Sequence, residues 1–422
     1  MNERLLQYIW QFQYFNFTDL ATQQGELLSI IHPGIINKNQ GPDFSDAKIK
    51  TGNTTWAGNI ELHVNSSDWK NHKHSEDENY KNIILHVVWK DDVDMKLSFP
   101  VLELQNRVSK VLLEKYNSLM QSANAIPCEK QIGVVDEFIW NNWKQRLLVE
   151  RLIEKSLPVS NHLAATNNHW EEVFWRMLAK NFGIKVNAEA FEKLAISLPI
   201  NILAKHKNQI HQLEALLLGQ ANVLVGDFKD DYCTMLQKEY QFLQKKHSLK
   251  PIGISLHYLR MRPSNFPTIR LAQLAMLIHQ SSHLFSKIID SSSLKEIQQL
   301  RDVTANDYWH YHYLPDEASI FKKKNLGKQM IDNILINTVV PMLFAYGHYN
   351  KENKYKERAI AWLEQLPAES NSITKIFSSA GLAIKSSFDS QSLIQLKNNY
   401  CSHKRCLECA VGNNILKRNV SS

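Results

Sequence analysis

Acidic and histidine side chains are concentrated in one stretch of the chain, residues 40–89. Asp43 follows a Gly-Pro turn that opens into an expected strand, and Glu61 and His63 lie two residues apart on the next. Alternate residues of a strand share a face, so Glu61 and His63 project the same way. If the two strands pair as neighbours, Asp43 and Glu61 converge on one divalent cation, with His63 alongside. Carboxylate ligands favour Mg²⁺ or Mn²⁺, and such an ion can activate water and neutralise charge that builds on a phosphodiester.

More histidines occupy the same stretch, namely His72, His74 and His86. A second interpretation is that some of these bind zinc together with His63 in a hydrolase, although their spacings match no zinc template closely. His86 lies between apolar residues and is equally well explained as a buried core histidine. A Glu and a His on a half-buried strand also often have no chemical role. Glu26, just before the first expected strand, is an additional ligand to consider.

The elements that must position these residues change character along the chain. Residues 1–14 place apolar side chains at helical spacing. Alternating or continuous apolar runs then predict strands at residues 27–31, 46–50, 56–64, 83–89 and 97–104. After about residue 120 the spacing is helical. We therefore predict an α+β protein, with a small domain of mixed sheet and flanking helices over residues 1–120 and a mostly α-helical domain over residues 121–422.

The expected elements follow one another in a definite order. A helix comes first, then a strand that begins at Pro42-Asp43, and then a strand that carries Glu61-Leu62-His63. In this the first 110 residues resemble the PD-(D/E)XK nuclease superfamily, which has the restriction-endonuclease-like fold. The resemblance implies a Mg²⁺-dependent nuclease that hydrolyses phosphodiester bonds of nucleic acid, with Asp43, Glu61 and His63 as catalytic residues and the two carboxylates as metal ligands. His63 stands where the superfamily usually has Lys, and it lacks the fixed positive charge of Lys. The alternative is a non-catalytic nucleic-acid-binding or scaffold protein that retains the nuclease fold.

Longer stretches of the sequence resemble a second family. The uncharacterised bacterial family named domain of unknown function 2851 is similar in the segments GPDFSDAKI, GNIELHVNSSDWKNHKH, YKNIILHVVW, RMRPSNFPTIRLAQLA and YCSHKRCLECAVG. These segments extend from near the N-terminus to near the C-terminus. The resemblance implies no particular activity.

Charge is unevenly distributed along the chain. Residues 1–110 contain 11 Lys and Arg against 14 Asp and Glu, and the remainder contains 38 against 28. The basic part suits a polyanion, and a solvated lysine-rich helical surface explains it equally well. Arg260, Arg262 and Arg270 could contact the phosphates of a nucleic acid, or they could bind carboxylates and hold helices together. The aromatic segment 307–313 offers the same choice between a stacking platform and packed core.

The sequence contains no stretch of about 18 apolar residues, and its first residues lack the pattern of a signal peptide. We expect a soluble cytoplasmic protein with no membrane partner.

The cysteines provide a prediction independent of the acidic stretch. Of five cysteines, Cys401, Cys406 and Cys409 form the pattern C-x₄-C-x₂-C. In a reducing compartment this clustering favours a metal over a disulfide. Cys128 is the first choice for a fourth ligand and His403 the second, with zinc as the metal. An iron–sulfur cluster is the other option, by a loose parallel with PD-(D/E)XK nucleases that carry one. The metal-free alternative is a set of small thiols packed at a helix junction.

Overall fold

The computed structural model describes residues 1–72, 74, 77–281, 283–301 and 303–418. The chain divides into two compact units, and each is considered by itself. The first unit joins three segments, 1–143, 375–382 and 396–422, and the second joins 144–374 and 383–395. This division differs from the predicted boundary near residue 120, because the C-terminal segment belongs with the N-terminal residues rather than with the helical region.

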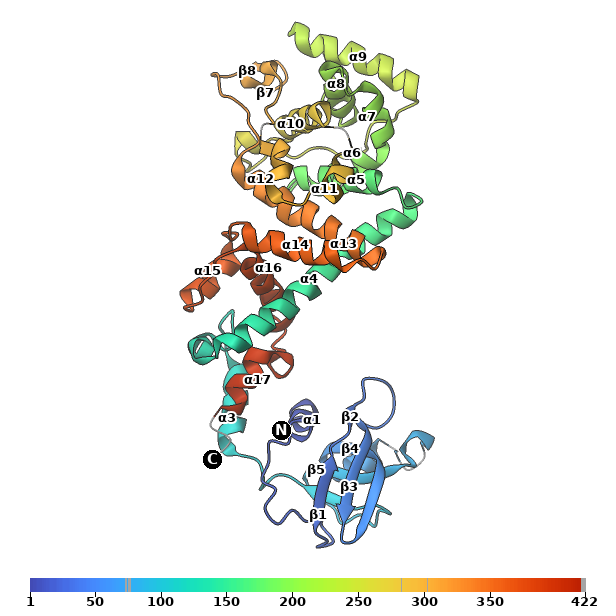
Figure 1. Ribbon diagram of the computed structural model, residues 1–422, viewed down its shortest axis with the longest axis vertical. Coiled ribbons are helices and arrows are strands. Elements are labelled where there is room, and N and C mark those ends of the chain that lie inside the picture. Colours follow the sequence, from blue (N-terminus) through green and yellow to red (C-terminus); the bar gives the residue numbers. More distant parts are fainter. Residues whose placement is uncertain (73, 75–76, 282, 302, 419–422) are drawn as a thin grey trace. The chain divides into compact units, whose positions relative to one another are not determined.

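The first unit contains a curled mixed sheet (Figure 1). Its strands are β1 (Leu28–His32), β2 (Ile35–Ile36), β3 (Phe44–Thr51), β4 (Thr54–Asn65), β5 (Ile83–Lys90) and β6 (Val101–Glu103). The order is β1-β3-β4-β5-β6, and β2 pairs with β3. The pairs β1–β3, β2–β3 and β3–β4 are antiparallel, whereas β4–β5 and β5–β6 are parallel. The predicted mixed sheet with flanking helices is confirmed, and β2 is an addition that the sequence did not predict.

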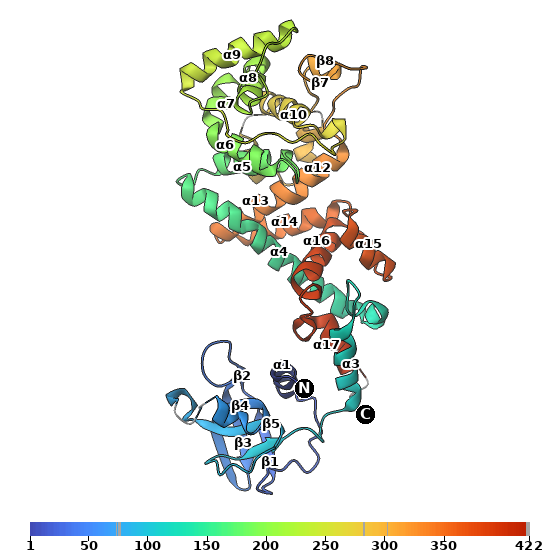
Figure 2. The same cartoon turned by 180° about the vertical axis from the view of Figure 1, so that it is seen from behind.

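The first unit also contains short helices. They are α1 (Glu3–Gln11), α2 (Asp68–Asn71), η2 (Glu78–Tyr80), α3 (Lys110–Gln121), η3 (Glu129–Val134), the π-helix η8 (Leu396–Cys401), η9 (Cys406–Glu408) and α17 (Ala410–Lys417). The α1 helix begins after Asn2, whose side chain accepts a hydrogen bond from the Leu5 N–H. It packs against β4, and α17 lies beside α3 although the two come from opposite ends of the chain (Figures 1 and 2).

The core of the first unit fixes the sheet against α1. Leu6 and Ile9 of α1 are fully buried with Ile60 of β4 and Leu85 of β5. At Gly58 in β4, a Cβ atom would lie 2.6 Å from the carbonyl oxygen of residue 82, so only glycine fits this close approach. The register between β4 and β5 therefore depends on a position without a side chain.

The second unit is mostly helical, as predicted. The helix α4 (Glu137–Ala165) begins in the first unit and continues into the second. The other elements are α5 (Trp170–Phe182), α6 (Ala188–Ser197), α7 (Ile200–His206), α8 (Ile210–Gln220), α9 (Asp231–His247), η4 (Pro263–Asn265), α10 (Pro267–Gln280), α11 (Leu284–Asp290), η5 (Leu294–Arg301), η6 (Asp307–His310), β7 (His312–Leu314), β8 (Glu317–Ala318), α12 (Lys328–Ile334), the π-helix η7 (Leu335–Val339), α13 (Val340–Tyr349), α14 (Asn353–Gln365) and α16 (Ser387–Gln395). The helix α15 (Ser372–Ser379) begins in the second unit, and its residues from Lys375 on belong to the first.

Two features of the second unit bear on the sequence predictions. The continuous helical span Lys328–Tyr349 is long and apolar enough to cross a membrane, but 78% of its apolar window is buried, as in a core helix. The aromatic segment 307–313 contributes to the core, because Trp309 is fully buried and donates its indole N–H to Glu214 at 3.1 Å. The β7–β8 pair that follows was not predicted.

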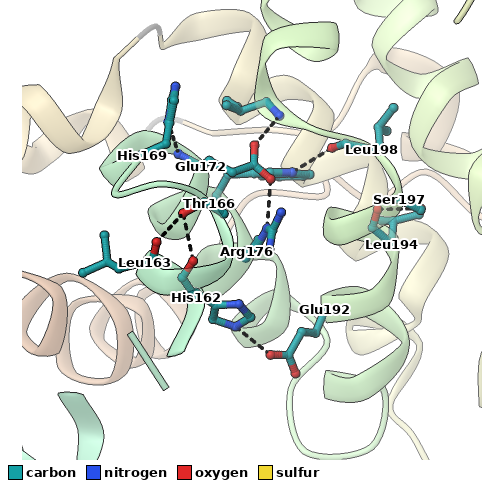
Figure 3. A network of polar contacts seen from close by, with 12 residues as sticks. His162, Leu163, Thr166, His169, Glu172, Arg176, Glu192, Leu194, Ser197 and Leu198 are labelled. Carbon is teal, nitrogen blue, oxygen red and sulfur yellow. Dashed lines mark hydrogen bonds and ion pairs between the residues drawn. The ribbon is translucent and has the colours of Figure 1, made fainter. Parts of the chain in front are cut away.

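A polar network joins α4, α5 and α6 (Figure 3). The buried carboxylate of Glu172 accepts hydrogen bonds from Arg176 at 2.9 Å and from the backbone N–H of Ile200 at 2.8 Å. His162 of α4 lies 3.0 Å from Glu192 of α6. Because the buried carboxylate has both a charged and a backbone partner, we interpret this network as structural.

Candidate functional site

Asp43 and Glu61 are linked across neighbouring strands. Asp43 directly precedes β3, and Phe44 pairs with Ile60 in β4. The backbone N–H of Asp43 donates to Glu61 Oε2 at 3.0 Å, and the backbone N–H of Leu62 donates to Asp43 Oδ2 at 3.0 Å. Each carboxylate is thus held by the strand that carries the other. The structure brings the two predicted carboxylates together on paired strands.

The environment of this pair disfavours two negative charges. Burial raises the pKa of Asp43 to about 6. Burial and the adjacent charge of Asp43 raise the pKa of Glu61 to about 8. Both shifts have the same sign because low polarity and like charge both penalise the ionised form. A divalent cation would remove this penalty, so the pair has the electrostatics of a cation site.

His63 extends the pair into a histidine cluster, which we define as His63, His72, His74 and His86. The Nε2 atom of His63 lies 3.7 Å from Glu61 Oε1 and 3.2 Å from His72 Nδ1. On its other side, His63 Nδ1 lies 2.8 Å from His86 Nε2. The Nε2 atom of His74 is 3.5 Å from Glu61 Oε1. The ligand atoms of His63, His72 and His74 all lie within 4.8 Å of one another, close enough to share one ion.

Burial keeps two of these imidazoles neutral. His63 is 1% exposed, and burial with the neighbouring histidines lowers its pKa to about 2. Burial likewise lowers the pKa of His86 to about 4. A neutral imidazole offers a nitrogen lone pair to a metal at pH 7. The buried Nε2 of His74 makes no hydrogen bond within the part of the chain that the structure describes, and it faces Glu61 Oε1 at 3.5 Å.

Aromatic side chains hold the cluster in place. Tyr80 stacks on His74 with ring centroids 3.9 Å apart, and buried Trp69 lies 5.3 Å from the rings of both His74 and His86. Trp69 belongs to α2, which follows β4 directly, and Tyr80 ends η2 before β5. The connection between these two parallel strands therefore supplies both ligand candidates and their packing.

Two residues of α1 belong to the site and were missed in the sequence. Gln7 donates its amide to Asp43 Oδ1 at 2.8 Å, and the charge of Glu3 contributes to raising the pKa of both Asp43 and Glu61. Their signal was available, since residues four apart share a helix face. Glu26, by contrast, is exposed in the turn before β1.

The structure places the three predicted arginines in different environments. Arg260 and Arg262 are exposed, whereas Arg270 is buried on α10. Its guanidinium donates to Gln273 at 2.9 Å and to Asn265 at 2.6 Å. Arg270 therefore joins a loop to a helix, which corresponds to the structural alternative and not to phosphate contact.

The structure brings Cys128 to the three C-terminal cysteines. The thiols of Cys128 and Cys401 interact electrostatically with Cys406 and Cys409, so Cys128 lies with the C-terminal three. His403 is exposed. This group lies in the first unit and is considered further below.

One family model matches the chain, over residues 3–372, and its description is "Protein of unknown function (DUF2851)". No curated protein and no solved structure matches. The matched segment includes the carboxylate pair and the histidine cluster, and it covers well over half of the sequence. The chain therefore belongs to the DUF2851 family.

Proposed function

We propose that this protein is a metal-dependent hydrolase that cleaves phosphodiester bonds in nucleic acid. The observation that carries the proposal is the pair Asp43 and Glu61, cross-bonded between two strands and faced by His63. A divalent cation would stabilise the ionised form of such a pair, and many enzymes that hydrolyse phosphodiesters use a divalent cation. The order of helix, Pro-Asp strand and Glu-x-His strand adds support, because it is the order of the PD-(D/E)XK signature.

The donor atoms bear on which ion is used. Mg²⁺ prefers oxygen ligands and keeps several waters, whereas imidazole suits zinc and other transition ions. Glu61 Oε1 faces both His63 and His74, so an ion at this carboxylate meets nitrogen as well as oxygen. We therefore expect Mn²⁺ or Zn²⁺ to bind more tightly than Mg²⁺.

When bound, the ion would supply an activated water and positive charge beside the scissile phosphate. Asp43 and Glu61 would hold the ion, and Gln7 and the Leu62 N–H fix the orientation of Asp43. His63 would bind the ion or orient its water through Nε2, because a pKa of about 2 makes it a poor store for a proton. His86 fixes the ring of His63 through the 2.8 Å contact at Nδ1.

Nucleic acid as the substrate is supported by charge. The residues after position 110 carry a surplus of Lys and Arg, and Arg260 and Arg262 are exposed. The second candidate function, a nucleic-acid-binding or scaffold protein without catalysis, is favoured by one observation. His63 occupies the position of the signature Lys and is neutral, so it cannot supply that positive charge.

A cleavage assay distinguishes these candidates. Purified protein is incubated with labelled single- and double-stranded DNA and RNA in Mg²⁺, Mn²⁺, Zn²⁺ or EDTA. We expect cleavage that requires the ion and is lost in Asp43→Asn and Glu61→Gln. The exposed Glu114 of α3 provides a matched control, Glu114→Gln, which should cleave normally.

Two further outcomes are informative. Binding of nucleic acid by wild-type protein without cleavage under any ion condition would favour the scaffold function. Cleavage that persists in well-folded Asp43→Asn and Glu61→Gln would place the active site elsewhere. His63→Lys should retain or raise activity if His63 occupies the Lys position, and an inactive folded variant would contradict that assignment.

A further inference from the structure

Four of the five cysteines meet in the first unit, and we define them as the cysteine cluster: Cys128, Cys401, Cys406 and Cys409. Cys128 directly precedes η3, whereas the other three lie between the end of η8 and the start of α17. Contacts of α17 with both η3 and η9 bring these segments together. Residues from distant parts of the sequence therefore converge on one place, which the local C-x₄-C-x₂-C pattern alone does not require.

The cluster is enclosed by the core of the first unit. Cys406 and Cys409 are each 7% exposed, and Cys128 packs against the same apolar core as Cys406. A Cβ atom at Gly412 would lie 2.3 Å from the Cys406 carbonyl oxygen, so α17 packs directly on this backbone.

Cys409 lies at the N-terminus of α17, directly before the first residue of that helix. A thiol is only a weak acceptor, whereas N–H donors and a helix N-terminus stabilise a sulfur that carries negative charge. A buried thiolate in turn requires a cation next to it.

We propose that the cysteine cluster is a four-thiolate centre for a thiophilic metal. Four sulfurs satisfy a structural metal site completely, and each thiol that binds loses its proton. The charges of Lys397 and Lys404 act on Cys401 and Cys406 respectively and offset part of the remaining negative charge.

The spacing of the sulfurs bears on the metal. Tetrahedral zinc, with Zn–S bonds of about 2.3 Å, brings its sulfurs to about 3.8 Å from one another. An iron–sulfur cluster divides its thiolates among several irons and spreads them further apart. Four thiolates suit either metal, and the two differ in the spacing that they impose on the sulfurs.

The centre would fasten the C-terminal segment of the first unit to the segment after α3. The chain leaves this unit within α4, returns to it for residues 375–382 and joins it again from Leu396. Covalent metal bonds across that interval restrict the unfolded chain, in the way that closing a long loop does. Loss of the metal should therefore lower the unfolding midpoint of the first unit even where the secondary structure is kept.

The test measures metal directly in full-length protein purified without oxygen. We expect either one zinc per chain, or iron and acid-labile sulfide in equal amounts with broad visible absorbance, and loss of the metal in Cys128→Ser. Cys233 provides the matched control, because it lies in the second unit, where its sulfur contacts the Tyr308 hydroxyl at 3.1 Å. Cys233→Ser should keep the full metal content.

The possible results divide clearly. Either zinc, or iron with sulfide, that is lost in Cys128→Ser supports the centre and identifies its metal. Folded wild-type protein with no metal and four freely titrating thiols, or with disulfides among them, overturns the proposal. If Cys128→Ser does not fold, native mass spectrometry of the wild-type protein tests the proposal instead. A bound metal should add its mass before chelation and not after it.

Discussion

Glu61→Gln should stabilise the metal-free first unit at pH 8. Burial and the charge of Asp43 raise the pKa of Glu61 from 4.5 to about 8. Between these pH values the folded protein binds more protons than the unfolded chain, so stability falls as the pH rises through them. The difference between these two pKa values, at about 1.4 kcal/mol for each unit, sets an upper limit of about 5 kcal/mol on the cost of the charge at pH 8.

The expected gain is smaller than this ceiling. Glutamine keeps an oxygen that can accept the hydrogen bond from the Asp43 N–H, and its amide group would face the imidazoles of His63 and His74. At pH 8 Glu61 also still carries a proton in about half of the wild-type molecules, because its pKa is about 8, so part of the repulsion is already relieved. We expect a net gain of about 2 kcal/mol at pH 8, or about 4–8 °C for a unit of this size. At pH 5 Glu61 is protonated in the folded protein, so the gain should disappear.

Thermal and urea unfolding, followed by circular dichroism and tryptophan fluorescence in EDTA at pH 5 and 8, measure this difference. The measurement is then repeated with Mn²⁺ or Zn²⁺. An ion that binds only the folded protein adds about 2.7 kcal/mol at 100 times its Kd, and Glu61→Gln should lose most of that gain. Glu114→Gln is the control that should change neither value.

A lower unfolding midpoint for Glu61→Gln in EDTA at pH 8 would refute this reasoning, because Glu61 would then act as a structural hydrogen-bond acceptor. An equal gain at pH 5 and pH 8 would also refute it, since charge would not be the cause. If the ion stabilises the variant as much as the wild type, it binds elsewhere.

Three other variants test other parts of the structure. His86→Gln should weaken metal binding about 10- to 100-fold in a metal titration, because His86 orients His63, and its circular dichroism should be unchanged. Burial raises the pKa of Glu214 to about 7, so its contribution to stability declines as the pH rises from 4.5 through 7. Glu214→Gln should therefore raise the unfolding free energy by about 1–2 kcal/mol at pH 8 and hardly at pH 4.5, as measured in urea. Gly58→Ala should cost about 1–3 kcal/mol in the same assay, because the new Cβ would lie 2.6 Å from the Asn82 carbonyl oxygen.

Much of the sheet could be predicted because its strands carry distinct patterns. The stretch from Trp56 to Val64 alternates, and the structure has β4 over Thr54–Asn65. The apolar run from Ile83 to Trp89 predicted a central strand, and β5 indeed lies between β4 and β6. Burial on both faces leaves little room for polar residues, which is why this position in the sheet is visible in the sequence.

The return of the C-terminal segment to the first unit could not be predicted from periodicity. The apolar face of α17 shows that the helix packs, but it does not say against which partner. Arg270 illustrates the same limit, because an arginine near prolines gives the same sequence pattern whether its side chain faces solvent or bonds to Gln273. Contacts between distant segments depend on shape, and spacing along one segment does not encode them.

The sequence favoured the carboxylate pair over the histidine cluster, because the spacing of the histidines is set by the sheet and not by one loop. His63 and His86 lie on the parallel strands β4 and β5, in which Glu61 pairs with His86. The connection between these strands contains α2 and, after it, His72 and His74. Zinc templates describe ligands that a single turn or helix brings together, so a set divided between two strands and their crossover matches none of them. A parallel crossover is, however, the connection in which residues after one strand can lie beside the start of the next. An acidic strand, a histidine-rich crossover and a histidine on the following strand should therefore be considered together as one candidate site, whatever their spacing.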